Sequence, residues 1–102
     1  MTMLDLREKD REAIIAIAKR TLGEDVVLWA YGSRIRGQGH AASDLDLVVR
    51  GAEDQPLPAE KWGVFRQALQ DSTIPILIQV FDWVELPESF REGIERDHVV
   101  LH

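Results

Sequence analysis

The amino-acid sequence predicts an α/β (α+β) fold, in which a small mixed β-sheet has its helices packed on one face. The first observation is the order of the patterns, because helical and strand-like segments follow one another as α, β, turn, β, α, β, α. The second is that the strand-like runs are short, apolar and bounded by glycine, proline or polar residues. The third is the length of 102 residues, which suits one hydrophobic core and predicts a single domain over residues 1–102.

Helix signals occur in three segments, at residues 10–22, 59–70 and 87–96. In the first segment, Ile14, Ile17 and Leu22 fall near one face, and Gly23 follows as a plausible C-cap. The second has an apolar set with helical spacing. The third begins with Pro87, which is favourable at the start of a helix because its fixed φ is already helical.

Strand signals occur in four apolar runs, at residues 26–31, 45–49, 75–83 and, as a short edge strand, 99–101. The first run is almost continuously apolar, which indicates burial on both faces. Between the first two runs the pattern predicts a Gly-Ser turn, a short helix that starts at Ser33 and ends near Arg36, and a returning loop.

Composition and charge exclude some classes of protein. The 18 acidic residues outnumber the 12 basic ones, and the resulting net charge of −6 disfavours direct nucleic-acid binding, which needs a basic surface. A nucleotide site is still compatible, because a cation and a few arginines can reverse the local field. The absence of cysteine fits a reducing cytoplasm, and no apolar run is long enough for a membrane helix.

Two aspartates stand inside the second strand-like run, which is the most informative feature of the chain. Asp44 and Asp46 are two residues apart, so in a strand both carboxylates point to the same face, about 6.6 Å apart at Cα. Two like charges side by side cost free energy, which a divalent cation removes, and Mg²⁺ commonly takes one or two carboxylates plus substrate phosphates. The alternative is an edge strand whose solvated acids deter aggregation.

The sequence around these acids resembles a known signature. GSRIRG at residues 32–37, followed by SDLDL at residues 43–47, is similar to the motif of the minimal nucleotidyltransferases, within the DNA polymerase beta-like superfamily. The resemblance covers nearly the whole chain and implies the nucleotidyltransferase fold. It also implies two Mg²⁺ ions, ATP as the donor, catalytic and metal-binding roles for Asp44, Asp46 and Asp82, and nucleotide-binding roles for Gly32, Ser33, Arg34, Arg36 and Ser43.

The turn and the arginines each have a simpler explanation. Gly32 and Ser33 could present backbone N–H groups to a phosphate at a helix N-terminus, or they could form an ordinary turn with Ser33 as a cap. Arg34 and Arg36 could contact the triphosphate or pair with surface acids, and their spacing prevents them from sharing one helical face. The choice between the two arginines stays open.

Asp82 is assigned as the third carboxylate from the order of the elements, because it ends the third apolar run. In that role it would bind metal and act as general base toward the attacking hydroxyl. The alternative is a strand-end aspartate that begins a turn before Pro87.

The resemblance implies a cytoplasmic antitoxin that transfers AMP from ATP to a hydroxyl of a partner protein, with a tyrosine of a HEPN-domain ribonuclease toxin as the expected acceptor. Two rivals are a non-catalytic antitoxin that neutralises its toxin by binding alone and a small-molecule nucleotidyltransferase. A weaker third is nucleic-acid end addition. No membrane contact is expected, and the sequence leaves a homo- or hetero-oligomer open.

Overall fold

A computed structural model describes residues 6–32 and 44–102 of the chain. Its three α-helices are α1 (Glu8–Leu22), α2 (Ala59–Asp71) and α3 (Glu88–Arg96), and two short 3₁₀ segments, η2 (Ala52–Asp54) and η3 (Trp83–Glu85), lie between them. All three helices stand where the sequence predicts them. Gly23 ends α1 with a φ of 100°, and its backbone N–H donates to the Lys19 carbonyl. No helix in the described part of the chain is long and apolar enough to cross a membrane.

The sheet consists of β1 (Val27–Tyr31), β2 (Leu45–Arg50), β3 (Ile78–Asp82) and β4 (Val99–Val100), in the spatial order β3-β2-β1-β4. β1 pairs antiparallel with both β2 and β4, whereas β2 and β3 are parallel. The parallel pair follows from the crossover through α2, since parallel strands need a long connection. The predicted mixed sheet is therefore confirmed, and β3 lies at its edge.

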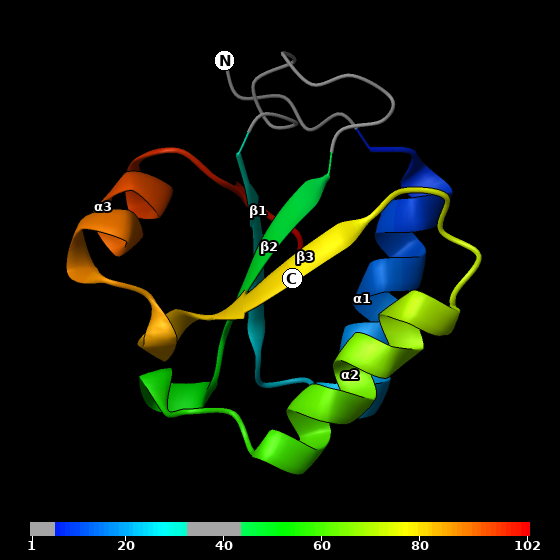
Figure 1. Cartoon of the computed structure of the whole chain (residues 1–102), viewed down its shortest axis with the longest axis horizontal. Coiled ribbons are helices and arrows are strands. Elements are labelled where there is room, and N and C mark those ends of the chain that lie inside the picture. The colour runs from blue at the N-terminus through cyan, green and yellow to red at the C-terminus, as the bar shows by residue number, and fades with distance from the viewer. Residues whose placement is uncertain (1–5, 33–43) are drawn as a thin grey trace.

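The helices form two unequal layers (Figure 1). α1 and α2 lie together on one side of the sheet, as expected, while α3 lies on the other side. On the way to α3, η3 places Trp83 edge-on against Trp29 of β1, with ring centroids 5.6 Å apart.

The larger part of the hydrophobic core lies between the sheet and the α1–α2 layer, and Val48, Trp83 and Ile94 extend it on the α3 side. Residues of β1 and β2 that alternate along the strands are fully buried with Ile14 of α1 and Phe65 of α2; they are Leu28, Ala30, Leu45, Leu47 and Val49. Because successive strand residues point to opposite faces, Tyr31 and Asp46 face away from this layer. The open face of the sheet thus carries the polar row described below.

Candidate active site

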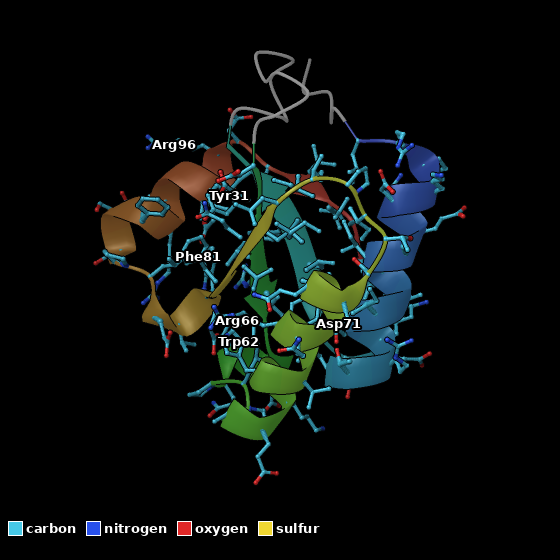
Figure 2. The ribbon with its side chains drawn as sticks, turned by 45° about the vertical axis from the view of Figure 1, so that its right-hand side comes forward. Tyr31, Trp62, Arg66, Asp71, Phe81 and Arg96 are labelled. Carbon is cyan, nitrogen blue, oxygen red and sulfur yellow. The ribbon has the colours of Figure 1, made fainter. Side chains whose placement is uncertain are left out.

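The strand register brings three polar side chains into one row across the sheet. Tyr31 of β1 pairs with Asp46 of β2, and Asp46 pairs with Gln79 of β3. Directly paired residues on neighbouring strands share a face, so all three point away from α1 and α2. Figure 2 shows Tyr31 and Phe81 on the α3 side of the sheet. The sequence correctly predicts the position of the acid pair on the face away from the α1–α2 layer.

Gly32 begins the turn that follows β1, directly beside the acid pair. Its φ of 89° lies in the left-handed region that favours glycine. A Cβ at this position would lie 2.6 Å from Oδ2 of Asp46, so the Asp46 carboxylate would have to move to make room for it. Glycine is therefore favoured by the backbone conformation, and it also leaves the Asp46 carboxylate in place. The other predicted nucleotide-binding residues, Ser33, Arg34, Arg36 and Ser43, lie outside the described residues, as does the short helix expected from Ser33.

The electrostatics of the row favour a positive partner. Burial raises the pKa of the Asp46 carboxyl, and the charge of Asp44 raises it further. Burial, with the charge of Asp46 as a second cause, raises the pKa of Tyr31 to about 12. Both shifts show that negative charge is unfavourable here without compensation. A cation bound by Asp44 and Asp46 would supply that compensation.

Gln79 is the residue that sequence reasoning missed. Its Nε2 donates a hydrogen bond of 2.6 Å to Oδ2 of Asp44, and its backbone is paired with that of Asp46. The available signal was a lone polar residue in the apolar run ILIQVF, two residues from Phe81, which shares its face. Gln79 also lines a hollow of about 520 Å³ along the outer edge of β3, beside Leu69 and Gln70 of α2.

Asp82 does not join this group, which corrects its expected role as third metal ligand and general base. Asp82 pairs with Val49, three residues further along the strands than the pair of Asp46 and Gln79. That separation is about 10 Å along the strand, and the odd number of steps turns its side chain to the opposite face. Its buried carboxylate accepts backbone N–H groups from Leu57, at 3.1 Å, and Val84, at 3.4 Å. The simpler alternative, a strand-end aspartate that begins a turn, describes what it does.

The described residues fit one divalent cation better than two. Asp44 and Asp46 offer hard oxygen ligands on one face, which matches the needs of Mg²⁺ with nucleotide phosphates. The described part of the chain contains no group of three or more His, Cys, Asp or Glu residues that could hold a metal. A two-carboxylate site is thus supported by the geometry, and a three-carboxylate site is not.

An aromatic wall borders the open face on the α3 side. Tyr31 packs edge-on against Phe90 of α3, with ring centroids 6.3 Å apart. Trp29 stacks on His98, and the Arg50 guanidinium lies 4.4 Å from the Trp83 ring centroid while it binds Asp54. Of these contacts, the one between Tyr31 and Phe90 joins α3 directly to the sheet.

A mixed sheet that places two aspartates beside a glycine turn on its open face defines a nucleotidyltransferase-type protein. Comparison with known proteins agrees, because residues 11–100 match the family model described as a nucleotidyltransferase domain. A relative from Haemophilus influenzae, named probable protein adenylyltransferase MntA, is 32% identical over 98 residues, which cover 96% of this chain and 83% of the relative. The chain belongs to the nucleotidyltransferase family, and the prediction that it is a nucleotidyltransferase enzyme is confirmed.

Two solved structures share the fold. One, described as the crystal structure of a toxin–antitoxin with AMP-PNP, has a TM-score of 0.72 and 16% identity, and the match covers 91% of this chain and 73% of that one. The other, described as a putative minimal nucleotidyltransferase, has a TM-score of 0.67 and 24% identity, and the match covers 89% of this chain and 88% of that one. The second likeness, together with the family match, confirms the nucleotidyltransferase fold.

Proposed function

We propose that this protein transfers AMP from ATP to a hydroxyl group of a partner protein, in a reaction that depends on Mg²⁺. The observation that carries the proposal is the acid pair on the open face of the sheet, in which Asp46 lies against Gly32 and Asp44 accepts a hydrogen bond from Gln79. The name of the Haemophilus influenzae relative, a probable protein adenylyltransferase, supports a protein acceptor and an adenylyl donor.

The reaction forms a bond between the acceptor oxygen and the α-phosphorus of ATP. The bond from that phosphorus to the bridging oxygen breaks, pyrophosphate leaves, and the hydroxyl proton passes to solvent. Bound Mg²⁺ would neutralise phosphate charge, and Asp44 and Asp46 are the residues that would hold it. From the resemblance of the motif we assign phosphate contacts to Ser33, to Ser43 and to one of the two arginines, Arg34 or Arg36. The protein contributes mainly positioning and charge compensation.

The proposed acceptor is a tyrosine of a HEPN-domain ribonuclease toxin, so that the modification silences the toxin. The resemblance of the sequence motif to minimal nucleotidyltransferases implies such a partner. The structural neighbour described as a toxin–antitoxin with AMP-PNP has the same fold and is consistent with a toxin partner and ATP binding. The acidic net charge of −6 would favour association with a basic ribonuclease surface. The reaction is expected in the cytoplasm, where ATP is available.

A binding-only antitoxin is the second candidate, and one observation favours it. The residue beside Asp46 on β3 is Gln79 rather than an acid, so the described residues offer only two carboxylates on the open face. Under this hypothesis the fold is retained for toxin binding, and chemistry at the acids is dispensable.

Intact-mass spectrometry of a HEPN-domain partner separates the two candidates. The partner is incubated with ATP, Mg²⁺ and either the wild-type protein or the Asp44→Asn/Asp46→Asn double variant. One or more added AMP masses with the wild type alone would establish protein adenylylation through the acid pair. An unchanged mass, together with a stable and silent complex for both proteins, would establish the binding-only antitoxin instead.

A further inference from the structure

Gln79 occupies the one position on β3 that is paired directly with Asp46. The parallel register places the two residues side by side on the open face of the sheet. On the other side of Asp46 the paired residue is Tyr31, which carries no carboxylate. Any third ligand supplied by the sheet at this level must therefore come from position 79.

The side chain of Gln79 forms a hydrogen bond with one member of the acid pair. Its amide N–H group donates to Asp44 at 2.6 Å and so occupies one carboxylate oxygen while it orients the group. An amide brings no charge, so the set of Asp44, Asp46 and Gln79 carries −2 at most. That charge matches a single divalent cation, whereas a glutamate at position 79 would raise it to −3.

No other described acid can take this place. Asp82 is the single acid of β3, and it lies on the opposite face, where its carboxylate accepts two backbone N–H groups. We propose that Gln79 is a positioning residue that restricts the acid pair to one divalent cation, by presenting an amide where a third carboxylate would complete a second cation site. This inference rests on the proposed function in that Asp44 and Asp46 hold the cation, and it replaces the expectation of two Mg²⁺ ions.

The test counts Mn²⁺ bound to the full chain by electron paramagnetic resonance, with α,β-methylene-ATP, an analogue that cannot be cleaved at the α-phosphate. The wild type is expected to bind one Mn²⁺ per complex. Gln79→Glu is expected to bind a second Mn²⁺, with an apparent affinity at least about tenfold above that of any second wild-type site. The reason is that the attraction between a new carboxylate and an adjacent divalent cation is larger than the free energy that corresponds to a tenfold change in affinity. Gln55→Glu, which adds the same charge on an exposed loop, should match the wild type.

Two wild-type Mn²⁺ ions of similar affinity, or no change in Gln79→Glu, would overturn the inference. If Gln79→Glu does not fold without metal, Gln79→Asp, which supplies the same carboxylate on a shorter side chain, takes its place in the count. The Asp44→Asn/Asp46→Asn variant separates this inference from the proposed function. If it binds Mn²⁺ as the wild type does, the acid pair is not the cation site, and both fail. If it loses the ion while Gln79→Glu changes nothing, only the role of Gln79 fails.

Discussion

The two ends of the β2–β3 pair treat their carboxylates in opposite ways. At the open end, Asp46 faces away from the α1–α2 layer, and the described residues supply no hydrogen-bond donor to its carboxylate. At the closed end, Asp82 is buried and accepts two backbone N–H groups. An aspartate at the open end thus has no hydrogen-bond donor among the described residues, whereas the aspartate at the closed end has two.

This difference distinguishes a carboxylate that is suited to bind a cation from one that stabilises the fold. A carboxylate that accepts backbone donors repays its burial locally and stabilises the fold, as Asp82 does where Leu57 approaches β3. A carboxylate with a raised pKa beside a second acid keeps an electrostatic cost that a bound cation would remove, as at Asp46. Substitutions at the open end should therefore lower the reaction rate, and substitutions at the closed end should lower the stability of the fold.

The largest effect is expected from Asp44→Asn and Asp46→Asn on catalysis. Each variant removes a ligand charge from the proposed cation site, which accounts for several kcal/mol of transition-state stabilisation, or about a thousandfold in rate. The measurement is the adenylylation rate of the HEPN partner at saturating ATP and Mg²⁺. Circular dichroism should show an intact fold in both variants. A rate within tenfold of wild type would place the chemistry elsewhere.

Asp82→Ala should show the reverse pattern, with a large loss of stability and little loss of chemistry. Two backbone N–H groups would lose a charged acceptor in a buried place, at a cost of about 2–4 kcal/mol. Urea unfolding measures the cost, and Asp82→Asn, which keeps one acceptor oxygen, should lose less. A thousandfold slower reaction from the folded Asp82→Asn variant would contradict the structural role and return Asp82 to the site.

Gly32→Ala sharpens the comparison because Gly23 provides a matched control. Both glycines have positive φ, so either alanine variant should cost about 1–3 kcal/mol of stability. Only at Gly32 would the new Cβ collide with the Asp46 carboxylate, whereas at Gly23 nothing lies within 4 Å. A displaced acid pair predicts a rate up to about 100-fold lower for Gly32→Ala and a normal rate for Gly23→Ala. Equal rates for the two variants would show that the turn does not position Asp46.

The sequence predicts the open end well and the closed end poorly, for a physical reason. Asp44 and Asp46 lie in one strand, so period-two alternation alone places them on one face. The residue of β3 that lies beside Asp46 depends on the register between two strands that are far apart in sequence, which alternation within one strand does not give. Asp82 lies three residues after Gln79, and because this number is odd, the two side chains point to opposite faces of the sheet. Element order could therefore identify the strand that borders the acids but not the residue.

The smallest effect is the pH dependence of stability at Asp46. Its pKa is raised in the folded protein, so between about 3.8, the ordinary value, and the raised value the folded state binds more protons than the unfolded state. Stability is therefore fully present at low pH and falls as the pH rises through the folded pKa. Asp46→Asn removes this titration, so its advantage over wild type should be absent near pH 3 and grow toward neutral pH.

Urea unfolding of both proteins between pH 3 and pH 7 measures that difference, and Mg²⁺ supplies the control. A cation on the acid pair should restore wild-type stability near neutral pH and leave Asp46→Asn nearly unchanged, because compensation needs both carboxylates. Mg²⁺ should not change the contribution of Asp82 to stability, since the Asp82 carboxylate already accepts hydrogen bonds from two backbone N–H groups. If Mg²⁺ stabilised both proteins equally, the cation would bind outside the pair, and the two ends of the sheet would no longer differ in the way proposed.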